Sequence, residues 1–256
     1  MKHRTLTRRQ MLLRGTVAFG GLALGACDRL TNSPSFAQVL QSAERLTYRG
    51  QRALIGTHAL AREYTTADLS PTFRSNGTSA PDTVEYQRLA QEQFQEWRLK
   101  IDGLVGQPLN LSLAAVRLMP TRTQITRHDC VEGWSAIGQW RGVPLSNVLN
   151  LAQISPRARF VVFHCADRLE RGEDPYYESI DLIDAFHPQT ILAYELNGRP
   201  LPVANGAPLR LRVERQLGYK QAKYVMRIEV VEHLRAIQGG KGGYWEDRGY
   251  EWYAGI

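Results

Sequence analysis

The sequence predicts a single domain of the mixed α+β class that is rich in strands. Its 256 residues, with 43% hydrophobic and 22% charged side chains, match an ordinary globular protein with one sizeable core. Short apolar runs with the period of a strand alternate with a few segments of helical period. No segment repeats elsewhere in the chain, which argues against a repeat architecture.

The first part of the chain is predicted to contain a helix and a long loop before its first strand. Apolar residues at helical spacing over 37–48 predict an amphipathic helix. Residues 65–83 are rich in Ser, Thr, Pro, Gly and Asn, and a loop of this length is either functional or loosely ordered. Residues 97–101 alternate in polarity and predict a strand that turns at Asp102 and Gly103.

The middle of the chain is predicted to hold two short helices with a strand between them. Ser112 is a favourable N-cap and Pro120 ends the helix predicted over 112–119. Residues 123–126 predict a strand. The second helix, predicted over 144–152, has a proline near its start, which helices tolerate.

The last hundred residues are predicted to supply most of the remaining strands. Residues 158–164 are almost entirely apolar, which indicates a strand buried on both faces. Asn197 and Gly198 are typical of a hairpin turn after a strand over 190–195. The other expected elements are one or two helical turns over 180–186 and strands over 209–213 and 224–231, the last with Tyr224, Met226, Ile228 and Val230 on one face.

The N-terminus has the features of an export signal. Residues 1–26 contain five Lys or Arg residues and no acidic residue, so they carry +5 of the net charge of +7 and leave +2 for the rest. The apolar run from Gly15 to Ala26 is too short to span a bilayer. The basic charge is therefore a targeting feature, and nucleic-acid binding loses its main support.

Two short motifs refine this prediction. The segment TRRQMLL, residues 7–13, is a twin-arginine pattern, which predicts transport of the folded protein to the periplasm by the twin-arginine export machinery. The alternative is a general secretory signal with two adjacent arginines by chance. The segment LGAC, residues 24–27, resembles a lipobox, in which Cys27 carries a lipid anchor; the alternative is simple cleavage near Ala26.

The segment RHDCVEGWS, residues 127–135, is the one around which the chain is organised. A thiol acts as a ligand or nucleophile only as the thiolate, and neighbouring cations favour that form. Here those cations are Arg127 and, when it is protonated, His128. The alternative is a buried structural cysteine, which is the commoner fate of a single Cys. Taken alone, this segment leaves both interpretations open.

This segment and those that follow it resemble the sulfite oxidase-type molybdopterin-binding oxidoreductase family, and within it the periplasmic protein-methionine-sulfoxide reductase catalytic subunits. The likeness covers about residues 97–253 in order and spacing. Its motifs are WRGVPL (140–145), CAD (165–167), PY (175–176), LAYELNG (192–198), NGAPLR (205–210) and GYKQAK (218–223). The resemblance implies the fold of that family, a molybdenum and molybdopterin cofactor, and transfer of an oxygen atom.

The resemblance also assigns candidate roles to individual residues. Cys130 supplies a thiolate to molybdenum beside the two dithiolene sulfurs of the pterin, so it is expected to stay unpaired, as is Cys165. Tyr176 is the second candidate catalytic residue, near the metal, where it could donate a hydrogen bond or relay a proton. The expected cofactor-binding residues are Arg74, Asn76, Cys165, Asn205, Arg210, Gly218, Tyr219, Lys220 and Lys223. The alternatives are a solvated turn for the residues around Asn76, a small core residue for Cys165, and solvated charges for the cations.

The expected organisation follows the same resemblance. Residues 1–27 form the signal peptide, residues 28–96 form a helix and long loop that pack on the catalytic domain, and residues 97–256 form that domain. We expect a monomeric protein, because the dimerisation and cytochrome domains of other family members are missing from the chain.

Departures from the family favour a neutral oxide as the substrate. Sulfite oxidases carry an Asn-Arg-Arg segment shortly after the metal cysteine, where this chain has Gly133-Trp134-Ser135. A dry site without those cations is expected to bind sulfite poorly and S-oxides or N-oxides, small or protein-bound, better. We therefore expect a reductase that receives electrons from an external partner, either a membrane haem protein or a cytochrome. The alternatives are a sulfite dehydrogenase that passes electrons to a cytochrome and a non-enzymatic, cofactor-binding lipoprotein.

Overall fold

The computed structural model describes residues 34–170 and 174–256. The predictions on the signal peptide, the twin-arginine pattern and Cys27 lie outside the described residues. Backbone contacts divide the chain into a first unit that ends at Leu54 and a second unit, Ile55–Ile256. The boundaries predicted after residues 27 and 96 stay predictions. No helix in the described ranges is long and apolar enough to cross a membrane.

The first unit contains the helix α2 (Pro34–Ile55). The helix predicted over 37–48 is therefore confirmed, and it is longer than its apolar pattern indicated. The prediction that it packs on the catalytic domain is not tested.

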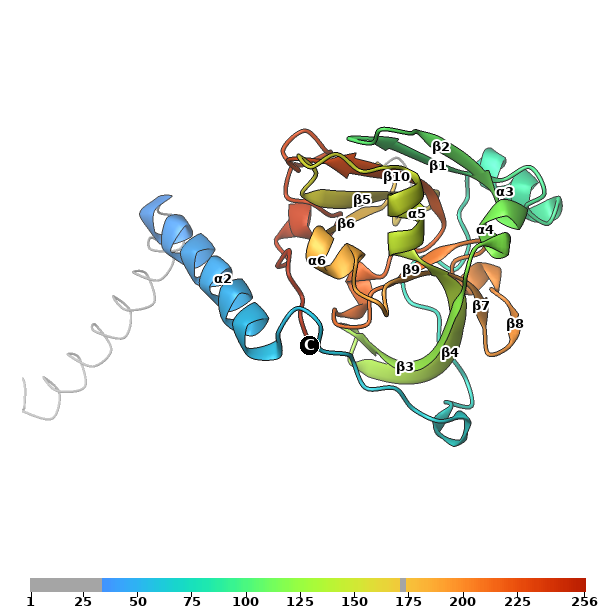
Figure 1. Ribbon diagram of the computed structural model, residues 1–256. Coiled ribbons are helices and arrows are strands. Elements are labelled where there is room, and N and C mark those ends of the chain that lie inside the picture. Colours follow the sequence, from blue (N-terminus) through green and yellow to red (C-terminus); the bar gives the residue numbers. More distant parts are fainter. Residues whose placement is uncertain (1–33, 171–173) are drawn as a thin grey trace, which may run out of the picture. The chain divides into compact units, whose positions relative to one another are not determined.

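Two five-stranded sheets form the second unit, which confirms the mixed, strand-rich class (Figure 1). One sheet has the order β2-β1-β10-β5-β6, and the other has the order β3-β4-β7-β8 with β9 beside β7. Only the pair of β1 and β10 is parallel among the described strands. The strands are β1 (Arg98–Gly103), β2 (Leu109–Ser112), β3 (Arg122–Cys130), β4 (Trp134–Pro144), β5 (Phe160–Cys165), β6 (Tyr177–Asp181), β7 (Ile191–Leu196), β8 (Arg199–Pro200), β9 (Arg210–Arg212) and β10 (Val225–Val231).

Short helices connect these strands and cover their faces. The α-helices are α3 (Val84–Gln91), α4 (Leu113–Leu118), α5 (Leu145–Leu151) and α6 (Leu182–Ala185), and the 3₁₀ helices are η1 (Thr66–Asp68), η2 (Val203–Asn205), η3 (Gly218–Lys220) and η4 (Glu246–Arg248). The Oγ of Ser112 accepts a hydrogen bond from the backbone N–H of Ala115 at 3.1 Å, which confirms the predicted cap of α4. The helix α6 packs on β5 and β6, while α5 packs on β4.

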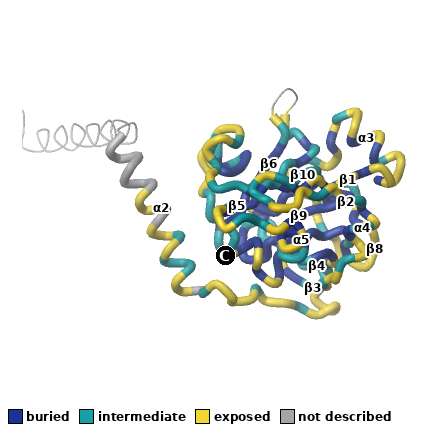
Figure 2. The backbone as a smooth tube through the Cα atoms, turned by 45° about the horizontal axis from the view of Figure 1, so that its top comes forward, coloured by how far each residue is buried: buried dark blue, intermediate teal, exposed yellow. Residues whose placement is uncertain are grey.

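The strands supply the larger share of the core, and the short helices add one face each. Every residue of β6 and β9 is buried, and β5 and β7 are buried along most of their length (Figure 2). The largest cluster of buried apolar side chains includes Trp97, Phe163, Tyr177 and Tyr224. A smaller cluster surrounds Trp140. Residues of β5 and β9 belong to the larger cluster.

Several elements differ from the sequence prediction. The helix predicted over 180–186 begins only at Leu182, because Ile180 pairs with Val161 in the ladder between β5 and β6. That pairing outweighs the local pattern. The strands β2, β4, β6 and β8 and the helix α3 were not predicted. A register shift between Val225 and Arg227 interrupts the strand predicted over 224–231; Tyr224, Ile228 and Val230 are buried in one apolar cluster, and Met226 packs half-buried against it.

Candidate functional site

A pocket of about 230 Å³ opens beside the end of β3. It is bounded by the turn between β3 and β4, the loop at residues 76–78, the facing ends of β5 and β6, and η3. Its lining residues are Asn76, Gly77, Thr78, Cys130, Val131, Glu132, Asp167, Leu169, Tyr176, Gly218, Tyr219, Gln221, Lys223, Trp245 and Tyr250. The pocket therefore unites sequence-predicted site residues from four distant parts of the chain.

The alternation of β3 decides which side chains of the central segment reach this pocket. Residues 124, 126, 128 and 130 are on the buried face, whereas Arg127 and Asp129 are on the opposite face. There Arg127 donates a hydrogen bond to Asp129 at 3.0 Å. The prediction that Arg127 and His128 act as cations beside the thiol is therefore wrong. Arg127 points away from Cys130, and His128 is held in its neutral form.

The thiol of Cys130 is 8% exposed and unpaired, and that of Cys165 is also free. Burial raises the pKa of Cys130; the charge of Glu132 adds to this effect, while the backbone N–H of Glu132 and the charge of Arg74 oppose it. Without a ligand, the thiol is accordingly protonated at neutral pH. A bound cation that displaces this proton would convert it to the thiolate.

His128 is fully buried, and its protonation state follows from one hydrogen bond. The guanidinium of Arg212 donates to Nδ1 at 3.0 Å, so this nitrogen is an acceptor and Nε2 carries the proton. Burial lowers the pKa of His128 further, with a contribution from the charge of Arg212. Nε2 makes no hydrogen bond of good geometry among the described residues, although the side chain of Gln221 interacts with the ring and partly offsets the fall in the pKa of His128. It lies against Gly218, where a Cβ atom would come within 2.6 Å of Nε2.

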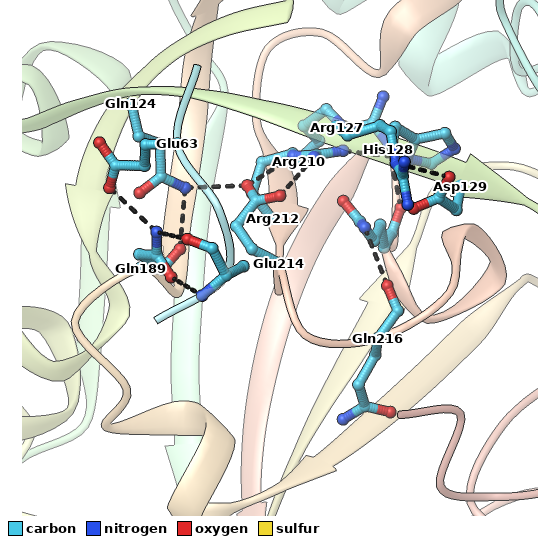
Figure 3. Close-up of polar contacts among 12 residues, drawn as sticks. Glu63, Gln124, Arg127, His128, Asp129, Gln189, Arg210, Arg212, Glu214 and Gln216 are labelled. Carbon is cyan, nitrogen blue, oxygen red and sulfur yellow. Dashed lines mark hydrogen bonds and ion pairs between the residues drawn. The ribbon is translucent and has the colours of Figure 1, made fainter. Parts of the chain in front are cut away.

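A network of buried hydrogen bonds extends from His128 through Arg212 and holds the imidazole in place (Figure 3). Arg212 forms a two-pronged ion pair with Glu214, with N–O distances of 3.0 and 2.6 Å. Gln124 donates to the same carboxylate at 2.8 Å and to the backbone carbonyl of Gln189 at 2.9 Å. The sequence did not predict this network, because its members come from β3, the turn before β7, and β9.

Two buried cations near the pocket have no carboxylate partner among the described residues. The guanidinium of Arg210 donates to the backbone carbonyls of Asn205 at 2.9 Å and Gln221 at 3.4 Å, and it lies 4.9 Å from the Trp140 ring centroid. Burial lowers the pKa of Arg210 to about 9. Burial likewise lowers the pKa of Lys223 to about 7. Burying charges in this way is unfavourable unless they meet a counter-charge.

Lys223 also fastens the loop that the sequence marked as functional or loosely ordered. Its ammonium donates to the carbonyls of Asn76 at 2.7 Å and Ala204 at 3.0 Å, and also to the carbonyl of Thr78. Asn76 thereby lines the pocket. The guanidinium of Arg74 instead lies over the Trp134 ring, 5.3 Å from its centroid, at the edge of the turn after Cys130.

The residues present fit an anionic ligand that extends from Cys130 towards Arg210. Besides Nε2 of His128, the buried donors Nδ2 of Asn205 and Nε of Arg210 have no partner in the described part of the chain. Three unused donors and two uncompensated cations match a phosphate group and a heteroatom-rich ring. The thiol at the other end suits a soft metal centre. The described residues contain no group of three or more His, Cys, Asp or Glu side chains placed to hold a metal ion by themselves.

Comparison with protein families gives a match over residues 86–236 to the oxidoreductase molybdopterin binding domain. The chain belongs to this family. Its cofactor is molybdopterin with molybdenum, it is an oxidoreductase of the molybdopterin type, and its fold is that of the sulfite oxidase-type proteins. The family resemblance found in the motifs of residues 97–253 is thus confirmed, as is the predicted cofactor.

Several named proteins are also similar to this chain. A candidate protein-methionine-sulfoxide reductase subunit, YedZ1, of Azospira oryzae is 35% identical over 99% of this chain and 90% of its own length. The catalytic subunit MsrP of Xanthomonas campestris is 39% identical over 56% of this chain and 47% of its own. Among solved structures, the sulfane dehydrogenase SoxCD from Paracoccus pantotrophus matches with a TM-score of 0.49 and 24% identity, over 54% of this chain and 39% of that one.

The structure separates the predicted site residues into three groups. Asn76, Cys130, Tyr176, Gly218, Tyr219 and Lys223 line the pocket. Asn205 and Arg210 lie behind its wall with unused donors. Arg74, Cys165 and Lys220 are placed elsewhere: Arg74 over Trp134, Cys165 in the apolar core, and Lys220 between the carboxylates of Glu178 and Glu246. The roles of all these residues towards the cofactor stay predictions.

Proposed function

We propose that this protein is a periplasmic reductase of S-oxides, small or protein-bound, that draws its electrons from an external donor. The names of the two curated relatives, which are methionine-sulfoxide reductase subunits, support this substrate class. The proposal concerns the substrate, the direction of electron flow and the location, all of which go beyond the family itself.

The lining of the pocket is the observation that carries the substrate class. None of its described residues is an arginine, and its one cationic side chain, Lys223, already donates to three backbone carbonyls. The walls are formed largely by apolar or aromatic side chains, including Val131, Leu169 and Trp245. A sulfite dianion would lose its hydration there without gaining fixed cations. A neutral S-oxide with an apolar substituent loses much less hydration free energy on entering the same pocket.

The residues of this chain then divide between holding the cofactor and shaping the substrate face. When bound, the cofactor supplies two-electron oxygen-atom transfer chemistry, which the protein itself lacks. In this proposal Cys130 provides a thiolate ligand and Arg210 neutralises the phosphate, while Lys223 holds the loop at residues 76–78 in the pocket wall. His128 and Asn205 donate their unused hydrogen bonds to the same ligand. Apolar residues of the pocket exclude water from the reacting atoms.

Tyr176 has a narrower role in this proposal than the sequence suggested. Its hydroxyl donates a hydrogen bond to the backbone carbonyl of Tyr219 at 2.6 Å. Burial raises the pKa of Tyr176 well above its usual range, and the charges of Glu178 and Glu246 add to this effect. The hydroxyl hydrogen is therefore already used by that carbonyl, so we assign Tyr176 to shaping the pocket wall rather than to donating a proton.

The proposed location and partners rest on the sequence. Twin-arginine export delivers a folded, cofactor-loaded protein, which suits a cofactor assembled in the cytoplasm. The electron donor is a membrane haem protein or a cytochrome. Mass spectrometry of the mature N-terminus would separate lipid attachment at Cys27 from cleavage near Ala26.

A dye-linked assay tests the function directly. Molybdenum-loaded protein should oxidise reduced viologen dye when methionine sulfoxide is added and should show little sulfite-dependent dye reduction. Cys130→Ser, which keeps the pocket but not the soft ligand, should lose this activity and change the molybdenum paramagnetic resonance signal. Rapid sulfite oxidation without sulfoxide reduction would reverse the proposal. Loaded protein with neither activity would favour the cofactor-binding lipoprotein.

A further inference from the structure

Asp167 is a buried carboxylic acid in the pocket wall that neither the motifs nor the family match assigns to any role. It lies two residues after the end of β5 and is 3% exposed, yet it lines the same pocket as Cys130. Its backbone carbonyl accepts the N–H of Tyr176 at 2.8 Å, which holds the two residues beside each other on one wall. Its Oδ1 atom has no hydrogen-bond partner among the described residues, while the side chain of Thr78 interacts with the carboxyl group and works against the rise in its pKa.

The titratable groups that face Asp167 come from every element packed around it. They are Lys223 after η3, Tyr86 on α3, Tyr224 before β10, Cys165 at the end of β5 and Tyr176 before β6. Burial raises the pKa of Asp167 to about 6, and the charge of Lys223 limits the rise. A bound anionic cofactor would raise it further, because a nearby negative charge favours the neutral acid.

The other candidate proton donors in this region are already engaged. The hydroxyls of Tyr86, Tyr176 and Tyr224 donate to the carbonyls of Ala207, Tyr219 and Thr78 at 2.6, 2.6 and 2.9 Å. Lys223 is held by three carbonyls. The remaining carboxylate of the lining, Glu132, is exposed and accepts the indole N–H of Trp134 at 3.0 Å. Asp167 alone among the described lining residues combines burial, an unused oxygen and a titration near neutrality.

We propose that Asp167 is the proton donor of the pocket, which delivers a proton to the oxygen that leaves the S-oxide. This inference rests on the proposed reductase function. In that reaction the S–O bond breaks and the sulfur is reduced by two electrons that come from the external donor. The oxygen takes up two protons and departs as water. Asp167 gives one of them and is protonated again from solvent, while the second comes directly from solvent. A positioned acid of this kind contributes about 10²- to 10⁴-fold to a rate.

The test compares molybdenum-loaded wild type, Asp167→Asn, Asp167→Glu and the exposed control Asp82→Asn. With methionine sulfoxide and reduced viologen dye, wild-type kcat should fall as the pH rises above the pKa of Asp167. Asp167→Asn should lower kcat about 100-fold, leave KM nearly unchanged and abolish the fall of kcat with rising pH. Asp167→Glu should restore part of the rate together with this pH dependence, and Asp82→Asn should match wild type.

Two measurements that do not depend on turnover complete the test. Infrared difference spectra of the loaded wild type should contain the carbonyl band of a buried carboxylic acid that titrates at pH 6 or above, and Asp167→Asn should lack it. Molybdenum and pterin contents should be equal in both proteins. A large loss of cofactor in Asp167→Asn would identify Asp167 as a cofactor-binding residue and overturn the proposal.

The remaining outcomes separate this role from the function on which it rests. Unchanged turnover and pH profile in Asp167→Asn, with an active wild type, would overturn the role of Asp167 alone. A fully loaded wild type that reduces no sulfoxide would overturn the proposed function, and this role with it.

Discussion

Replacing Gly218 by alanine tests the tightest contact in the site. An added Cβ would lie 2.6 Å from Nε2 and 2.7 Å from Cε1 of His128, and 3.2 Å from the carbonyl oxygen of Asp129. The imidazole has little freedom to withdraw, because it is fully buried, bonded to Arg212, and packed between Phe73 and Trp134 at centroid distances of 5.8 and 5.4 Å. Overpacking at such a site costs about 1–3 kcal/mol in the free energy of unfolding.

A double-mutant cycle identifies the partner in this clash. We expect Gly218→Ala to lower the unfolding free energy of the cofactor-free protein, measured by urea and tryptophan fluorescence, by about 1–3 kcal/mol. With His128→Ala already present, the same substitution should cost less than about 0.5 kcal/mol, since the ring no longer occupies the space. An equal cost in both backgrounds would show that the His128 contact is not responsible. A negligible cost in the wild type would refute the geometry itself.

The remaining predictions concern the buried cations and one helix cap. Burial lowers the pKa of Lys223 from 10.5 to about 7, so the unfolded chain binds the extra proton between these values. Stability of the cofactor-free protein should therefore rise with pH from about 7 to 10, by up to about 5 kcal/mol, and urea unfolding of Lys223→Met should lack this rise below about pH 9, above which Arg210 also contributes. Arg210→Gln removes a cation with no carboxylate partner among the described residues; it should lower pterin content, measured by fluorescence after release, at least about tenfold. A folded variant with full pterin content would contradict this. Ser112→Ala removes the cap of α4 and should cost about 0.5–2 kcal/mol in unfolding free energy, and an unchanged urea midpoint would show that the cap is not stabilising.

Local signals in the chain identified many elements because short-range chemistry defines them. The cap at Ser112 and the Asn197-Gly198 turn depend only on neighbouring residues, and both are present in the structure. The elements that were wrong or missing depend on distant partners. Residues 177–181 form a strand because β5 lies beside them, and no local pattern reveals that neighbour.

The same division applies to the site. Ordered motifs predicted the family and its cofactor, and the two residues predicted to be catalytic, Cys130 and Tyr176, line one pocket. Motif matching could not distinguish Lys223, which reaches the pocket, from Lys220, whose ammonium lies between two buried carboxylates. The two lysines are three positions apart in a single matched segment. Only the path of the backbone through η3 and the residues after it directs their side chains differently.

By itself, then, the sequence determined the family, the cofactor and the identity of the central thiol, because these depend on residue types at fixed spacing. The tertiary structure decided the electrostatics. It made His128 neutral through Arg212, turned Arg127 away from the thiol, and brought Asp167 into the same pocket as Cys130. Protonation states depend on burial and on charges from other strands, and these quantities exist only once the chain is folded.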